Sequence, residues 1–398
     1  MKKLLLLGGS IQQISAIKYA RQQGYYTILC DYLSDNPGQS FADEYHNVST
    51  TDKEAILQIA VEKNIDGIVA YASDPAAPTA AYVGNKLDLP SNPYESVRIL
   101  TRKDLFRKFL SENNLNCPQA ISFCAKNDIE GQLSGFAFPL IIKPVDSSGS
   151  KGVCKVQSQA ELEEVFDYSL SYSREKRVIV EEFMEMDHEC MIGGDIFVIN
   201  GKLEFCGLLN SHRDPQVSPY VPIGTSYPVF INDQKIEAVK KEIQKILDLL
   251  HIKSGALNLE FMFGKNGKLY PIELGPRNGG NMIPELLHMT HSFDSIRATV
   301  ECALGNNTIQ AGKPIRDLFL STYVIHSAKS GYLKEIIYHD DIEKNIFKKI
   351  IYKKEGDYVE KFNGANKALD IVFLQYPNLE ELQYKMRYMN QYIKVQVW

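Results

Sequence analysis

The stretch from Phe138 to Lys155 most limits what this chain can fold into. An apolar run from Leu140 to Ile142 predicts a buried strand that ends at Lys143-Pro144, and alternation from Val153 to Val156 predicts a second strand. The loop between these strands holds Ser147, Ser148, Gly149, Ser150, Lys151 and Gly152. Because a strand and not a helix follows the loop, the stretch is neither a Walker P-loop nor a Rossmann fingerprint.

This loop suits a polyphosphate. Glycines let the backbone approach a ligand closely, and successive N–H groups form an anion-binding concavity. Lys143, at the end of the first strand, would add a fixed positive charge under the same anion. The alternative is a Ser/Gly-rich surface hairpin with two solvated lysines.

The composition describes an ordinary globular protein of two or three domains. The chain has 398 residues and a net charge of −5, which does not suit a nucleic-acid binder. The four leucines after Lys3 are too few for a signal peptide or a membrane span. The seven scattered cysteines contain no Cys-x-x-Cys pair and favour free thiols in a reducing cytoplasm.

The first 93 residues alternate strands and helices. Strands are expected at Leu4–Leu7, Tyr26–Cys30 and Ile65–Tyr71, and helices at Ile11–Gln23, Thr51–Asn64 and Pro78–Lys86. This alternation predicts an open parallel α/β sheet, in which ligands bind beyond the carboxyl ends of the strands, at Gly8-Gly9-Ser10, Asp31 and Ser73-Asp74. An NAD site is the rival use, but the first turn lacks the third, packing glycine.

The middle of the chain mixes hairpins and helices. Helices are expected at Thr101–Glu112, Gln159–Ser171 and Asp233–His251, and strands at Arg177–Phe183, Cys190–Val198 and Leu203–Leu209. The segment Ser211–Tyr227, with prolines at 215, 219 and 222, is expected to be a long irregular loop.

The most specific local signal is a second hairpin, Asn258–Phe263 and Leu269–Glu273, joined at Asn266-Gly267. A two-residue loop there makes paired positions sum to 533, so that Glu260 faces Glu273 with Cβ atoms about 5 Å apart. Like charges opposed in this way are destabilising unless something lies between them, and two carboxylates suit Mg²⁺. Leu259, Phe261, Phe263, Tyr270, Ile272 and Leu274 would form an apolar face on the other side. Solvated surface glutamates are the alternative.

Arg277 lies just beyond this hairpin, in Gly275-Pro276-Arg277-Asn278. Beside a metal it would clamp a phosphate or a carboxylate.

Taken in this order, these motifs resemble the ATP-grasp superfamily, and within it the carboxylate–amine ligases of the purine-biosynthesis type and the biotin carboxylase and carbamoyl-phosphate synthase architecture. The resemblance implies an α/β fold of three parts. These are an N-terminal open parallel α/β domain (1–95), a two-part α+β ATP-grasp clamp (96–310) with a lid at about 118–185, and a C-terminal β-rich domain (311–398).

The resemblance also implies roles for matching residues. Lys103 and Lys143 would bind the phosphates, and the loop Ser147, Ser148, Gly149, Ser150 and Gly152 would close over them. Glu181, Glu182 and Phe183 would form the hinge that reads adenine, and Glu189, with His188 as a neighbouring candidate, would bind ribose. Glu260 and Glu273 would hold Mg²⁺ or Mn²⁺, Arg277 would orient the acyl phosphate, and His212, Arg213 and Asp74 would face substrate.

One position departs from the family pattern. The residue two places after the second metal carboxylate, usually Asn, is Gly275 here. Position 275 would face Asn258 on the carboxylate side, so Asn258 or water is expected to fill the gap. The alternatives are that a second metal ion binds more weakly or that the enzyme is degenerate.

The expected reaction is ATP-dependent activation of a carboxylate as an acyl phosphate, followed by transfer to an amine. Its partners would be small molecules, with no nucleic acid and no membrane, in the cytoplasm, and a homodimer is left open. No chemistry is expected in the C-terminal region. The alternatives are a carboxylase that uses bicarbonate, a nucleotide-binding protein without turnover, and an NAD-linked dehydrogenase.

Overall fold

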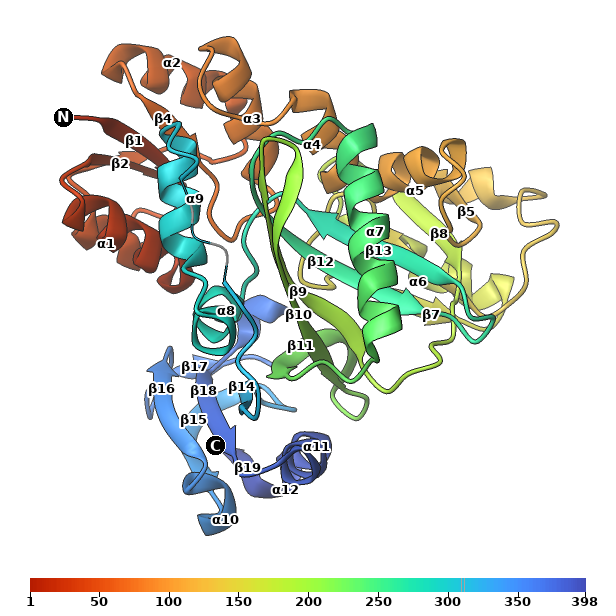
Figure 1. Ribbon diagram of the computed structural model, residues 1–398. Helices are drawn as coiled ribbons and strands as arrows, with labels where there is room; N and C mark the ends of the chain where they lie inside the picture. Colours follow the sequence, from red (N-terminus) through yellow and green to blue (C-terminus); the bar gives the residue numbers. More distant parts are fainter. Residues whose placement is uncertain (309, 311) are drawn as a thin grey trace.

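The computed structural model describes residues 1–308, 310 and 312–398. Four β-sheets organise the chain (Figure 1). No helix within these residues is long and apolar enough to cross a membrane.

The N-terminal sheet is parallel, in the order β3-β2-β1-β4, as the strand–helix alternation predicts. Its strands are β1 (Lys3–Leu7), β2 (Tyr26–Asp31), β3 (Glu44–Asn47) and β4 (Gly67–Val69), and its helices are α1 (Ile14–Gln22), α2 (Lys53–Lys63) and α3 (Ala77–Lys86). Alternate residues of β1 pack on α1 on one face and on α2 and α3 on the other. Asp52 is the N-cap of α2, because its Oδ1 accepts from Ala55 N at 3.1 Å. The short strand β3 was not predicted.

The second sheet is antiparallel, in the order β5-β8-β6-β7, and carries the Ser/Gly-rich loop between β6 and β7. Its strands are β5 (Ala120–Phe123), β6 (Leu140–Pro144), β7 (Cys154–Val156) and β8 (Val178–Glu182). Helix α6 (Gln159–Ser171) begins at its N-cap Ser158 and buries Leu162 and Phe166 against this sheet. Helices α4 (Tyr94–Thr101) and α5 (Lys103–Glu112) lead into it.

The third sheet has eight strands, in the order β13-β12-β9-β10-β11-β14-β18-β16. The strands from the middle of the chain are β9 (Met191–Ile199), β10 (Lys202–Asp214), β11 (Ser218–Tyr227), β12 (Gly255–Phe263) and β13 (Leu269–Gly275). Helix α7 (Asp233–Leu249) and helix α5 cover one face of β9, β12 and β13. The irregular loop predicted for Ser211–Tyr227 is wrong, since β10 and β11 pair as a hairpin through most of it.

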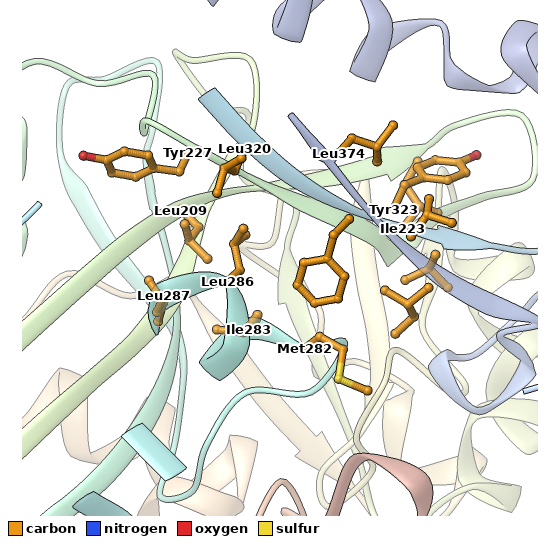
Figure 2. Packing of buried hydrophobic residues seen from close by; sticks show 14 of the residues in the cluster. Leu209, Ile223, Tyr227, Met282, Ile283, Leu286, Leu287, Leu320, Tyr323 and Leu374 are labelled. Atoms are coloured by element: carbon orange, nitrogen blue, oxygen red, sulfur yellow. The ribbon is translucent and has the colours of Figure 1, made fainter. Parts of the chain in front are cut away.

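Helix α8 (Ile283–His291) packs on the opposite face of this sheet. Figure 2 shows Ile283 and Leu286 of α8 gathered with Leu209 of β10 and Leu320 of β14 in one apolar layer. Helix α9 (Ser295–Ala303) instead packs Val300 and Ala303 on the N-terminal sheet, beside α1.

The C-terminal residues extend the third sheet and build the fourth. Strands β14 (Phe319–Ile325), β16 (Ile346–Ile351) and β18 (Asp370–Tyr376) complete the eight-stranded sheet, which therefore continues across the boundary expected at 310/311. The fourth sheet, β17-β15-β19, has the strands β15 (Gly331–Tyr338), β17 (Tyr358–Val359) and β19 (Ile393–Val397). The helices here are α10 (Asp340–Glu343), α11 (Leu379–Arg387) and α12 (Met389–Tyr392).

Candidate active site

Strands β12 and β13 place Glu260 directly opposite Glu273, and Asn258 opposite Gly275, as predicted. The expected loop is wrong, however. Gly264 N donates to Lys268 O at 2.9 Å, so three residues and not two form the turn, and Phe263 pairs with Leu269. A β-bulge between Glu260 and Phe261 then shifts the register by one residue and brings the two carboxylates face to face.

The bulge also moves Ile272 out of the predicted apolar face. Phe261 pairs with Pro271 and Glu260 with Glu273, which leaves Ile272 as the extra residue. Ile272 lines the cavity beside Glu273 and is not part of the core under α7. The bulge therefore directs two consecutive residues of β13 toward the site.

The two carboxylates differ in their surroundings. Glu260 accepts from Arg213 Nη2 at 2.6 Å. The pKa of Glu273 is raised, first by burial and then by the nearby charges of Asp74 and Glu260, while Lys103 opposes the shift. A cation between the two side chains would relieve this repulsion.

Asn258 is held so that its amide oxygen is available on the same strand. Its Nδ2 donates to Gly194 O and to Asp195 Oδ1, both at 2.9 Å. Within the described part of the chain, no group of three or more His, Cys, Asp and Glu could hold a metal. Two carboxylates and one amide oxygen do fit Mg²⁺, which is commonly bound by one or two carboxylates together with substrate phosphates.

The two lysines reach the same region from different elements. Lys103, at the start of α5, donates from Nζ to Ser147 O at 2.6 Å. Lys143, in β6, lies 2.7 Å from Glu181 Oε2 and is nearly buried. Burial lowers the pKa of Lys143 to about 8, although the Glu181 carboxylate opposes this shift.

The Ser/Gly-rich loop is folded over the site and touches other parts of the chain. Ser150 Oγ donates to Tyr220 O of β11 at 2.8 Å, and Ser147 Oγ donates to Lys151 O at 3.0 Å. Gly152 has a φ of +73°, and a Cβ there would come within 3.0 Å of Pro144 and Tyr172. Glycine is therefore required where the loop leaves the site.

These groups surround a cavity of about 570 Å³, here called the nucleotide cavity. The predicted residues that line it are Lys103, Lys143, Ser147, Gly149, Ser150, Glu181, Glu182, Phe183, Glu189, His212, Arg213, Glu260 and Glu273. In the predicted adenine hinge, the N–H groups of Glu182 and Phe183 already donate to Gln119 O and Pro139 O, both at 3.1 Å. Those two donors are therefore not free for a base.

The C-terminal region, in which no chemistry is expected, contributes two side chains to the wall of this cavity. Met386 and Arg387 of α11 line the nucleotide cavity, and Arg387 Nη2 lies 2.7 Å from Glu189 Oε1. His188, the other ribose candidate, is bound away from the cavity, because its Nε2 accepts from Phe263 N at 3.0 Å. This geometry favours Glu189 over His188.

A second cavity of about 590 Å³, the substrate-side cavity, adjoins the first along Glu260, Glu273 and the Ser/Gly-rich loop. It is lined by the predicted residues Ser148, Asp74, Asn258 and Arg277, together with Asp31 and the C-terminal Lys353. Gly152, also predicted, lines neither of the two cavities. Arg277 binds Asp74 through Nε and Nη2. His212 is buried, its Nε2 lies 2.8 Å from Ser226 Oγ, and burial lowers its pKa to about 3, so it is a neutral ring.

Sequence reasoning missed Arg107, Asp195 and Arg387. Asp195 accepts from Gly279 N and from Asn258, and so fixes the loop that carries Arg277. Arg107 lies one helical turn after Lys103, which is the only sequence signal that pointed to it. No sequence pattern pointed to Arg387, because it reaches the nucleotide cavity only through the packing of α11 against the rest of the protein.

Comparisons with known proteins agree with this geometry. Residues 136–285 match the ATP-grasp domain family. Formate-dependent phosphoribosylglycinamide formyltransferase of Bacteroides thetaiotaomicron is 27% identical over 286 residues, which are 70% of this chain and 71% of that protein. Phosphoribosylglycinamide synthetase from Anaerococcus prevotii has a similar structure, with a TM-score of 0.74, 22% identity and complete coverage of both chains. L-amino acid ligase from Bacillus licheniformis has a TM-score of 0.80 at 18% identity, and the match covers 100% of this chain and 99% of that one.

The fold and the site thus define an ATP-binding enzyme whose nucleotide cavity lies between two antiparallel sheets. Residues 136–285 carry an ATP-grasp domain, and over 70% of its length the chain is similar to formate-dependent phosphoribosylglycinamide formyltransferase.

Proposed function

We propose that this enzyme uses ATP to join a substrate carboxylate to an amine. The observation that carries the proposal is that Lys103, Lys143 and the registered pair Glu260 and Glu273 line one cavity. Two cations delivered by separate segments suit a triphosphate, and two opposed carboxylates suit Mg²⁺ or Mn²⁺. When bound, the metal would neutralise charge on the phosphates.

In the proposed reaction, an oxygen of the carboxylate attacks the γ-phosphorus and the bond to ADP breaks. The amine nitrogen then attacks the carbonyl carbon of the acyl phosphate. The bond between that carbon and the phosphate oxygen breaks, phosphate leaves with its electron pair, and the nitrogen loses a proton. Lys103 and Lys143 would stabilise the charge that develops on the transferred group. Arg277, whose Nε and Nη2 donate to Asp74 and whose Nη1 donates to Asn278 O, would direct its remaining N–H groups toward the acyl phosphate.

The substrates would occupy the substrate-side cavity, where Asp74 and Arg277 lie beside the carboxylate pair. The Ser/Gly-rich loop would exclude water, which hydrolyses acyl phosphates. The domain limits at 95/96 and 310/311, the cytoplasmic location and a homodimer formed through the C-terminal region remain predictions. Light scattering on the purified protein tests the homodimer.

Hydroxylamine tests the function without knowledge of the native amine. Purified protein, ATP and Mg²⁺ are incubated with hydroxylamine and a panel of amino acids, hydroxy acids and sugar acids, and ADP and acyl hydroxamate are measured. We expect at least one acid to give both products in equal amounts, and Lys143→Met to give neither. Fixation of labelled bicarbonate without hydroxamate would instead favour the carboxylase. ATP binding without ADP from any acid would favour the non-catalytic alternative.

A further inference from the structure

The guanidinium of Arg107 is buried behind the site, on helix α5, and no role has yet been assigned to it. Its side chain is only 3% exposed. The same helix buries Phe106, Phe109 and Leu110 in the apolar core. A cation in such surroundings is costly unless partners compensate for its lost hydration.

The partners of Arg107 belong to two different sheets. Its Nε lies 3.0 Å from Glu181 Oε1, on β8 of the second sheet, β5-β8-β6-β7. Its Nη2 donates to Ile272 O at 3.0 Å, on β13 of the eight-stranded sheet. One side chain therefore spans the junction between the two halves of the clamp.

Each of these contacts leads directly to a group of the proposed active site. The other oxygen of Glu181 lies 2.7 Å from Lys143 Nζ, so Arg107 and Lys143 hold one carboxylate between them. Ile272 is the bulged residue that precedes Glu273. Arg107 therefore contacts the neighbour of Glu273, a proposed metal ligand, and it also contacts the carboxylate that binds Lys143, a proposed phosphate ligand.

The charges of this cluster are arranged for an anion. Two buried cations share one buried carboxylate, which leaves one net positive charge at the wall of the nucleotide cavity. Burial alone would raise the pKa of Glu181, but Arg107 and then Lys143 outweigh it and the pKa is lowered. Glu181 is therefore ionised, and without Arg107 it would neutralise Lys143 completely.

A purely structural arginine would be a poor choice at this position. Its Nη1 has no hydrogen-bond partner among the described residues. Buried ion pairs are often replaced by apolar side chains of similar volume at no cost in stability. An incompletely satisfied cation that lies buried in a core calls for another explanation.

We propose that Arg107 is a positioning residue. It shares the Glu181 carboxylate with Lys143, so that one net positive charge remains there for the phosphates, and it fixes the bulge that presents Glu273. The proposal rests on the proposed function, because both groups that Arg107 positions are assigned there.

The test uses the full-length protein and three variants on one helix. Arg107→Met removes the charge at similar volume, and Arg107→Lys keeps the charge but cannot reach both partners. Lys108→Met is the matched control, because Lys108 is its exposed neighbour on the same helix, 70% exposed. ADP affinity is measured by calorimetry with and without Mg²⁺, and unfolding is followed in parallel.

We expect Arg107→Met to weaken ADP binding at least tenfold with Mg²⁺ present, Arg107→Lys to recover part of this loss, and Lys108→Met to bind within twofold of the wild type. ADP affinity within twofold of wild type in Arg107→Met, whatever its melting temperature, would overturn the proposal. If the wild-type protein binds no ADP at all, the proposed function itself fails, which is a different result.

A double-mutant cycle keeps the proposal testable if Arg107→Met is poorly folded. In a Glu181→Gln background the carboxylate that Arg107 restrains is absent, so Arg107→Lys should weaken ADP binding by a smaller factor than it does in the wild-type background. An effect of Arg107→Lys that is the same in both backgrounds would show that it does not act through Glu181, and would overturn that part of the proposal.

Discussion

Arg277 and Asp74 form a two-point ion pair that joins the N-terminal sheet to the loop after β13, with Nε–Oδ1 at 2.7 Å and Nη2–Oδ2 at 2.6 Å. The two residues are 203 positions apart, and both side chains are largely buried. The pair therefore links the substrate-side cavity to the carboxylate hairpin.

Replacing one partner of this ion pair should lower the free energy of unfolding more than replacing both partners. Asp74→Ala leaves the buried Arg277 cation without its carboxylate, and we expect a loss of about 3 kcal/mol in the free energy of unfolding. The double variant Asp74→Ala/Arg277→Met should recover part of that loss, because the orphaned charge is gone. Urea unfolding of the single and double variants measures both, and additive losses would contradict this account.

The opposed carboxylates of Glu260 and Glu273 should lower the free energy of unfolding without metal and should be needed for metal binding. Glu273→Gln removes a like charge from the face of Glu260, so without metal we expect the free energy of unfolding to rise by about 0.5 kcal/mol. We expect Mg²⁺ with ADP to raise the melting temperature of the wild type, and Glu273→Gln should abolish this increase. Differential scanning fluorimetry with and without Mg²⁺ and ADP measures both effects. A variant that is still stabilised by Mg²⁺ and ADP would count against Glu273 as a ligand.

The sequence predicted this carboxylate pair through two errors that cancel. Asn266-Gly267 indicated a two-residue turn, but the turn has three residues, which shifts the register by one. The bulge beside Glu260 shifts it back, and no local sequence signal marks that bulge. The alternation of strand and helix in the first 93 residues was more robust, because each apolar run there is buried on both faces.

Other features depend on tertiary contacts that sequence patterns do not carry. The prolines at 215, 219 and 222 indicated a loop, yet Pro215 lies in the turn and Pro222 pairs with Arg213 where the β10–β11 register shifts. Only Gly224 to Tyr227 of β11 pair with β14, so Pro219 and Pro222 need no N–H on that side. Arg107 and Arg387 gain their positions from the docking of helices, which leaves no local pattern.

The charge of Lys143 should set the alkaline limit of ATP use. Its pKa is lowered to about 8, mainly by burial, so the ammonium loses its proton as the pH rises through about 8. Since the charged form binds phosphate, kcat/KM for ATP should fall above pH 8. Arginine keeps its charge throughout this range, so Lys143→Arg should show no such fall up to pH 9.5 even if its activity is low. Steady-state profiles from pH 6 to 9.5 test this, and an identical decline in both proteins would assign it to another group.

The Arg387–Glu189 pair should matter little for affinity, although it lies in the nucleotide cavity. The two side chains are 55% and 39% exposed, and exposed pairs contribute about 0–1 kcal/mol. Arg387→Ala should therefore change KM for ATP by less than about fivefold. Glu189→Ala, which also removes the proposed ribose acceptor, should raise it by more. Measuring KM for ATP in both variants tests the order, and a larger effect from Arg387→Ala would mean that the arginine itself contacts the nucleotide.

Acid should destabilise the protein partly through His291, which lies far from the proposed chemistry under the eight-stranded sheet. Its ring is buried against Phe205 and Tyr227, and burial lowers its pKa to about 4. The unfolded chain takes up the proton near pH 6.5 and the folded chain only near pH 4, so stability is lost as the pH falls through this range, by about 3 kcal/mol at the acid end. In His291→Phe this part of the loss should vanish, while His212, whose pKa is lowered to about 3, still contributes in both proteins. Urea unfolding at pH 7.5, 6, 5 and 4 gives the difference between the two proteins. If that difference does not change with pH, His291 is not the group responsible.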